Sequence, residues 1–156
     1  MEHPPLNSLY QELILQHYRK PRNKGEMPDS SLEIHLNNPV CGDEIKLQLK
    51  IEDDVITDVK FVGTGCSISQ AAVSMMTARL MNKSVADASA LGTRFTELMK
   101  GDQDAARDKT LGDLRALAGV SKFPVRIKCA LLGFDALQQL LNRHSDSSLE
   151  EKKAAV

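Results

Sequence analysis

Apolar residues recur at two different spacings along this chain. Between residues 6 and 18 they return every three or four positions, which predicts one buried helix face. From residue 32 onward they alternate with polar residues, which predicts strands over 32–36, 45–51 and 59–61 with one wet face. The short Asp53-Asp54 link predicts an antiparallel hairpin between the last two strands.

The rest of the chain has helical spacing. We expect helices over 68–81, from a Ser84 cap to Met99, over 111–117, and from Pro124 to about Asn142, with a polar loop over 102–110. A half-wet antiparallel sheet needs helices on its dry side. The sequence therefore predicts an α+β fold, a three-stranded antiparallel sheet with helices packed on one face. We expect a single domain over 1–144 and a disordered tail over 145–156.

Length and charge narrow the functional classes. A chain of 156 residues suits one core without disulfides. A net charge of −1, with 4% aromatic residues and no Trp, argues against a nucleic-acid partner. No apolar run is long enough to span a membrane, and the first residues lack the features of a secretory signal, so we expect a cytoplasmic protein.

Three cysteines and one aspartate are the candidate chemistry. Cys41 and Asp43 flank Gly42, which lets the loop turn so that both side chains can face the same way. Cys66 follows a glycine-rich turn with Gly65 at the start of a helix, where the helix dipole favours a thiolate. Cys129 lies beside Lys128 and three residues after Arg126, and nearby cations also favour a thiolate.

Spacing alone leaves simpler interpretations open. Free cysteines are often small buried hydrophobes, and Cys129 shares a helix face with apolar residues. Asp43 after a glycine is common turn chemistry. The absence of a Cys-x-x-Cys pair argues against a zinc ribbon or finger. His17 lies on the apolar stripe of the first helix, where a packing role is more common than ligation.

Three loop motifs taken together are more specific than these spacings. The segments Asn38-Pro39-Val40-Cys41-Gly42-Asp43, Gly65-Cys66-Ser67-Ile68-Ser69 and Val125-Arg126-Ile127-Lys128-Cys129-Ala130-Leu131-Leu132 occur in this order. In that respect the chain resembles the U-type iron–sulfur assembly proteins, which comprise IscU, the N-terminal domain of NifU, and SufU. The resemblance covers roughly residues 6–142, and the predicted order of elements agrees with that family's fold.

Three departures point to the SufU branch of this family. The scaffold branch has a histidine ligand immediately before the third cysteine, where this chain has Lys128, and a protonated lysine cannot ligate a metal. The scaffolds' Leu-Pro-Pro-Val-Lys motif is replaced by the segment 122–126, Lys-Phe-Pro-Val-Arg. The stretch over 101–119 resembles an insertion that is typical of the SufU branch.

The resemblance implies one Zn²⁺ held by Cys41, Asp43, Cys66 and Cys129. It also implies sulfur transfer, with Cys41 accepting persulfide sulfur from a SufS-type cysteine desulfurase and a SufB-type scaffold complex as the downstream acceptor. Zinc would keep Cys41 deprotonated, and Arg126 would bias the local charge. Two alternatives stay open, a scaffold on which a transient [2Fe–2S] cluster is assembled, and a non-catalytic module in which zinc only fixes the loops.

Overall fold

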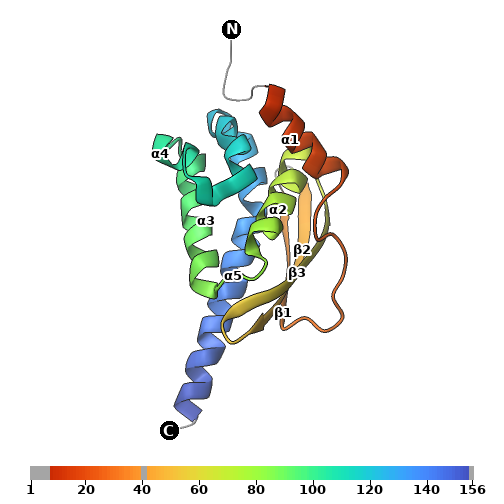
Figure 1. The fold of residues 1–156 in the computed structure, drawn as a ribbon. Coiled ribbons are helices and arrows are strands. Elements are labelled where there is room, and N and C mark those ends of the chain that lie inside the picture. The colour runs from red at the N-terminus through yellow and green to blue at the C-terminus, as the bar shows by residue number, and fades with distance from the viewer. Residues whose placement is uncertain (1–7, 40–41, 155–156) are drawn as a thin grey trace.

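The computed structural model describes residues 8–39 and 42–154. A helix is followed by three strands and then by helices, as the apolar spacing predicts (Figure 1). In chain order the elements are α1 (Ser8–Arg19), β1 (Leu32–Asn38), β2 (Asp43–Glu52), β3 (Val55–Thr64), α2 (Ser67–Leu80), α3 (Val85–Met99), α4 (Gln103–Ala106), the 3₁₀ segment η1 (Lys109–Lys122) and α5 (Pro124–Ala154). Among the described residues, no helix combines the length and the apolar character needed to cross a lipid bilayer.

The three strands form one antiparallel sheet in the order β1-β2-β3. Ile34, Leu47 and Phe61 lie opposite one another across the three strands, and all three are buried. Asp53 and Asp54 both have positive φ in the turn between β2 and β3. Such turns match the right-handed twist of paired strands. The predicted hairpin is therefore confirmed.

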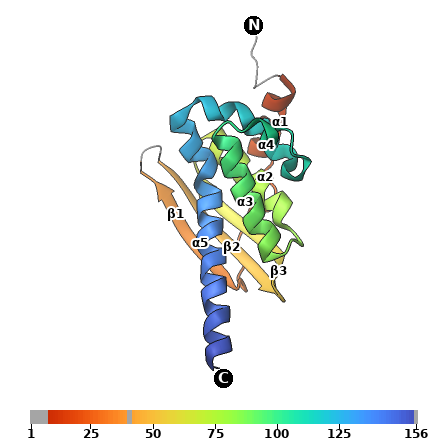
Figure 2. The ribbon, with the colours of Figure 1, turned by 90° about the vertical axis from the view of Figure 1, so that its left-hand side faces the viewer.

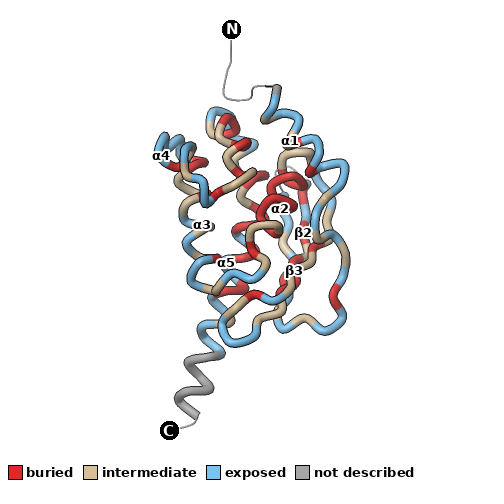
Figure 3. The backbone as a smooth tube through the Cα atoms, in the orientation of Figure 1, coloured by how far each residue is buried: buried red, intermediate tan, exposed pale blue. Residues whose placement is uncertain are grey.

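The helices gather on one face of this sheet, which confirms the predicted fold class. Figure 2 shows α5 crossing β1 and β2, and α2 packs against β3 and α5. Outside them, α3 and η1 pack against α5, and α1 packs against α2. The buried residues form a continuous run in α2, which passes between these layers (Figure 3).

Polar contacts join α1 to this core. His17 is only 4% exposed, and its Nδ1 lies 2.8 Å from Ser74 Oγ while its Nε2 lies 2.9 Å from Asp113 Oδ2. The expected packing role of His17 is thus confirmed, because both ring nitrogens have partners. Met75 and Met76 are fully buried in the same core.

The outer face of the sheet is drier than the alternation predicts. Gln48 points to that face and is nevertheless 4% exposed, because the segment after α1 crosses over it. Its amide oxygen accepts a hydrogen bond from the Met27 N–H at 2.9 Å, and its amide nitrogen donates to the Met27 carbonyl at 2.8 Å. A glutamine can therefore be buried here because its amide is satisfied by backbone.

Three expectations for the helical half need correction. The expected loop over 102–110 contains the short helix α4, which the Asp102 side chain caps through the Asp104 and Ala105 N–H groups. The expected helix over 111–117 is part of the longer η1, which is kinked at Gly112. The last helix continues past Asn142 to Ala154, because the polar sequence there has no helix-breaking residue. The division into a domain over 1–144 and a tail stays a prediction.

Candidate metal and thiol site

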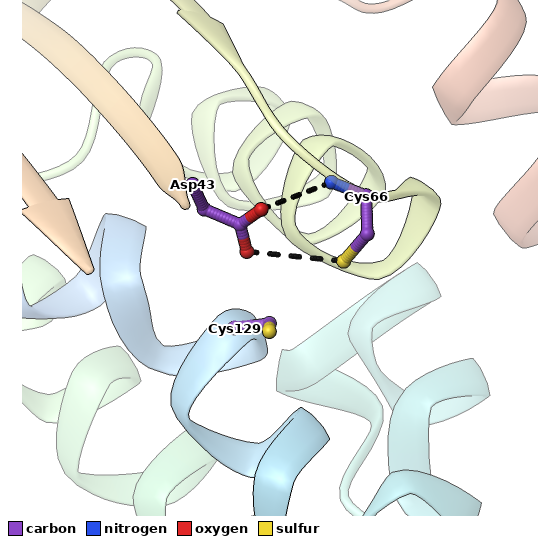
Figure 4. Close-up of side chains that lie close together, drawn as sticks. All are labelled: Asp43, Cys66 and Cys129. Atoms are coloured by element: carbon purple, nitrogen blue, oxygen red, sulfur yellow. Dashed lines mark hydrogen bonds between the residues drawn. The ribbon is translucent and has the colours of Figure 1, made fainter. Parts of the chain in front are cut away.

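Asp43, Cys66 and Cys129 meet at one end of the sheet, although they are far apart in sequence (Figure 4). One carboxylate oxygen and the two Sγ atoms all lie within 4.8 Å of one another. The three residues come from the start of β2, the start of α2 and the first turns of α5. Because β2 and β3 are antiparallel, the start of β2 and the end of β3 lie at the same end of the sheet, and α2 begins beside them.

Asp43 is buried and is held in place by the β1–β2 turn and by a hydrogen bond to the backbone of Cys66. It is 1% exposed and pairs with Asn38 across the β1–β2 turn. Gly42 has a φ of 73° in this turn, which favours glycine, and its N–H donates to the Asn38 carbonyl at 2.8 Å. The Asp43 carboxylate uses one oxygen to accept from the Cys66 N–H at 3.1 Å, which leaves the other oxygen 3.8 Å from Cys66 Sγ. The carboxylate thereby fixes the backbone that carries the first thiol.

Cys66 is the N-cap residue of α2 and is half-buried. Its carbonyl accepts hydrogen bonds from Ser69 Oγ at 3.2 Å and from the Gln70 N–H at 3.1 Å. At Gly65, a Cβ atom would lie 2.5 Å from Asp43 Oδ1 and would also collide with Ser69 Oγ. Gly65 is therefore needed for the close approach of the loop to the carboxylate. Ser69 is a supporting residue that the patterns did not single out, although its place three residues after the N-cap is a signal for this role.

Cys129 enters the cluster from α5, which begins at Pro124. It is fully buried, and its thiol lies 3.7 Å from the Val125 carbonyl, to which it can donate. Burial alone would fit a core cysteine, but its Sγ also belongs to the cluster with Asp43 and Cys66. Its environment is therefore partly polar, unlike that of an apolar core position.

Two cations flank the cysteine of α5. Arg126 lies close enough to the thiols that the charges of Cys66 and then Cys129 raise the pKa of its guanidinium. Lys128 is exposed and lines a groove with Pro39 and Leu132 beside the loop that leads to Cys41. Cys41 itself, the predicted acceptor and fourth ligand, lies outside the described residues.

The described donors fit a zinc ion. Tetrahedral zinc takes thiolate sulfur at about 2.3 Å and carboxylate oxygen at about 2.0–2.2 Å, which places neighbouring donors roughly 3.5–3.8 Å apart. The separation of Asp43 Oδ2 and Cys66 Sγ, 3.8 Å, is close to this range, and all three donors lie within 4.8 Å of one another. A set of two sulfurs and one oxygen suits zinc better than the harder magnesium or calcium ions.

Comparison with known proteins gives these features a family context. Residues 9–130 match the family model described as the NifU-like N terminal domain. The chain is 47% identical over 135 residues to the zinc-dependent sulfurtransferase SufU of Bacillus subtilis (strain 168), covering 86% of this chain and 90% of that protein. It is 42% identical over 142 residues to the iron–sulfur cluster assembly scaffold protein IscU of Streptococcus pyogenes serotype M1, covering 91% and 88%. A crystal structure of an iron–sulfur cluster assembly scaffold protein for the SUF system from Fervidobacterium islandicum AW-1 superimposes with a TM-score of 0.74 at 30% identity, covering 83% of this chain and 94% of that one.

Proposed function

Because this chain belongs to the NifU-like N-terminal domain family, we propose that it is a zinc-dependent sulfurtransferase for iron–sulfur cluster assembly. In this role it accepts sulfur from a cysteine desulfurase. The observation that carries the proposal is the convergence of Asp43, Cys66 and Cys129 from three separate elements. Burial of the Asp43 carboxylate costs free energy, and a cluster that served only as apolar core would not need a carboxylate.

We assign the metal to Asp43, Cys66, Cys129 and Cys41. The backbone supports the fourth ligand, because Cys41 is two residues from Asp43 and the chain spans at most roughly 7 Å over that separation. When bound, zinc supplies Lewis acidity that keeps its cysteine ligands as thiolates at neutral pH. Arg126 provides a fixed positive charge beside this negative donor set.

The transfer step is a thiol–disulfide type exchange at Cys41. Its thiolate attacks the terminal sulfur of a persulfide on the desulfurase, forming a new S–S bond. The original S–S bond breaks, and its electron pair leaves on the desulfurase cysteine as a thiolate. Cys41 then carries the persulfide and no net oxidant is consumed. We choose Cys41 because its place in the sequence, between the residues of β1 and β2, predicts a loop position, whereas Cys66 and Cys129 are held by helices.

This chemistry requires a persulfide donor and an acceptor for the sulfur. We propose a SufS-type desulfurase as the donor and a SufB-type scaffold complex as the downstream acceptor. We place the reaction in the cytoplasm, where free thiols stay reduced.

A scaffold for a transient [2Fe–2S] cluster is the second candidate function, and the similarity to IscU of Streptococcus pyogenes favours it. Lys128 argues against it. This residue stands beside Cys129, where the scaffold branch has a histidine ligand, and it is exposed on α5. An ammonium group has no lone pair for a metal, so the fourth donor of a scaffold site is missing at this position.

The test measures cysteine turnover by a SufS-type desulfurase with and without this protein, alongside its metal content. We expect about one zinc per chain, stimulated turnover, and a persulfide on Cys41. Cys41→Ala should abolish persulfide formation and stimulation, whereas Asp146→Ala, which removes an exposed carboxylate on α5, should leave both unchanged. A stoichiometric coloured iron cluster without stimulation would favour the scaffold function, and a persulfide on the Cys41→Ala protein would overturn the choice of acceptor.

The same turnover assay also separates sulfur transfer from a purely structural zinc. If zinc only fixes the loops, the unmodified protein will leave desulfurase turnover unchanged, while cysteine substitutions will lower only the thermal stability.

A further inference from the structure

A second cavity lies between α2, α3 and the start of η1. Its volume is about 430 Å³, within the usual range of roughly 300–1,000 Å³ for small-molecule sites. None of its lining residues belongs to the cluster of Asp43, Cys66 and Cys129. Any ligand bound here would therefore be separate from the proposed sulfur chemistry.

Arg79 is held firmly at the wall of this cavity. Its Nη2 donates to the Thr110 carbonyl at 2.8 Å. Gly112 lies against its side chain with a φ of 56°, and a Cβ there would be 3.2 Å from the Cδ, Nε and Nη1 atoms of Arg79. The Nε atom is buried and has no hydrogen-bond partner among the described residues. A guanidinium carries five N–H donors, so this side chain is positioned with donors to spare.

Of the cations that line the cavity, two remain available to a ligand. Arg94 is already committed, because its Nε donates to Asp108 Oδ2 at 2.7 Å. The other oxygen of Asp108 accepts from the N–H and hydroxyl of Thr110 at 2.9 and 2.7 Å. Lys83, by contrast, has no side-chain hydrogen bond or ion pair to any described residue. Arg79 and Lys83 are thus the cations that a ligand can use.

Between Asp87 and Arg94, α3 also lines the cavity with apolar side chains, and the charged lining limits the charge of a ligand. Ala90 and Leu91 of α3 line the cavity and are accessible, whereas Ala88 behind them is buried. Asp87, whose carboxylate has no cation within ion-pair distance among the described residues, would repel a second negative charge. A ligand with one acid group and a short aliphatic body matches the two available cations and the apolar side chains of Ala90 and Leu91.

We propose that this cavity binds a small aliphatic monocarboxylate. Its carboxylate meets the guanidinium of Arg79 and the ammonium of Lys83, since a guanidinium fork matches a carboxylate in geometry and charge. Its hydrocarbon part lies along Ala90 and Leu91. The ligand would join α2 to α3 and η1 in a site that is independent of the thiols.

The test titrates the full-length protein with 3-methylbutanoate by isothermal calorimetry and by amide chemical shifts. We expect saturable binding with a Kd of about 1 mM, ordinary for a ligand of this size. The uncharged analogue 3-methylbutanol tests the acid group, and inorganic phosphate tests the need for one charge and an apolar body. Each should bind at least about tenfold more weakly.

Matched variants locate the site. Lys83→Gln should weaken 3-methylbutanoate binding at least about fivefold, and Arg79→Gln at least about tenfold. Arg107→Gln removes an exposed cation that does not line the cavity, so it should bind as the unmodified protein does. Lys83 is exposed, so its variant should fold even if loss of Arg79 loosens η1. Absence of saturation, equal binding of the alcohol, or unchanged binding by the folded Lys83→Gln protein would each overturn the proposal.

Discussion

Gly65→Ala should damage the metal site without removing any ligand. The new Cβ would lie 2.5 Å from Asp43 Oδ1 and 2.8 Å from its Cγ. An ordinary contact needs about 3.5 Å, so the carboxylate must move by roughly 1 Å. The movement disturbs the 3.1 Å hydrogen bond from the Cys66 N–H and the 3.8 Å approach of Oδ2 to Cys66 Sγ.

The expected size of the effect follows from the role of Asp43. Disturbing the groups that orient metal ligands typically lowers affinity about 10–100-fold. Overpacking by one methyl group should also cost about 1–3 kcal/mol of unfolding free energy in the metal-free protein. The loss of zinc affinity and the loss of unfolding free energy can be measured separately. Only the loss of zinc affinity changes the difference in unfolding free energy between the zinc-loaded and the metal-free protein.

The assay measures zinc affinity by competition with a chelator and stability by urea unfolding, each with and without zinc. Gly92→Ala is the matched control. Its Cβ would meet Phe134 Cδ1 at an ordinary 3.6 Å inside α3. The control should keep full zinc affinity and gain about 0.5–1 kcal/mol, because alanine favours the helix. If the folded Gly65→Ala protein binds zinc as tightly as the control, Asp43 does not belong to the metal site as described.

Two further predictions concern stability. Gly133→Ala should lower the unfolding free energy by about 1–3 kcal/mol, because its Cβ would lie 2.8 Å from Val73 Cγ2 where α5 crosses α2, and urea unfolding that shows no loss would contradict this packing. Hydrogen bonds from Thr110 and then Arg94 lower the pKa of Asp108 from 3.8 to about 2. Because the folded pKa is the lower one, the stability advantage over Asp108→Asn should be complete above about pH 4 and disappear as the pH falls toward 2, which thermal unfolding across that range would test.

Local sequence determined most of the architecture. The alternation over 32–61 and the Asp53-Asp54 turn predicted the sheet, because a pleated strand places successive side chains on opposite faces. The cap at Ser84 was also readable, and its Oγ accepts from the Asp87 N–H at 3.0 Å. Each of these signals depends only on residues that are close together in the sequence, so no knowledge of distant contacts was needed.

Other elements depended on contacts that local patterns do not contain. The burial of Gln48 results from a segment that crosses the sheet from more than twenty residues away in sequence, with the Met27 backbone satisfying its amide. The kink of η1 at Gly112 accompanies the packing of Arg79 from α2 against it. A polar loop and a short helix have similar compositions, so α4 could not be distinguished in advance.

The site divides in the same way. The residue types and motifs identified Asp43, Cys66 and Cys129 as candidates, but each could equally have been a turn or core residue on its own. Only the tertiary structure brings their donor atoms within 4.8 Å. This requires that the start of α2 and the first turns of α5 both lie at the end of the sheet where β2 begins. Sequence spacing carries no information on such a meeting, since the distance between loops is set by how α2 and α5 pack on the sheet.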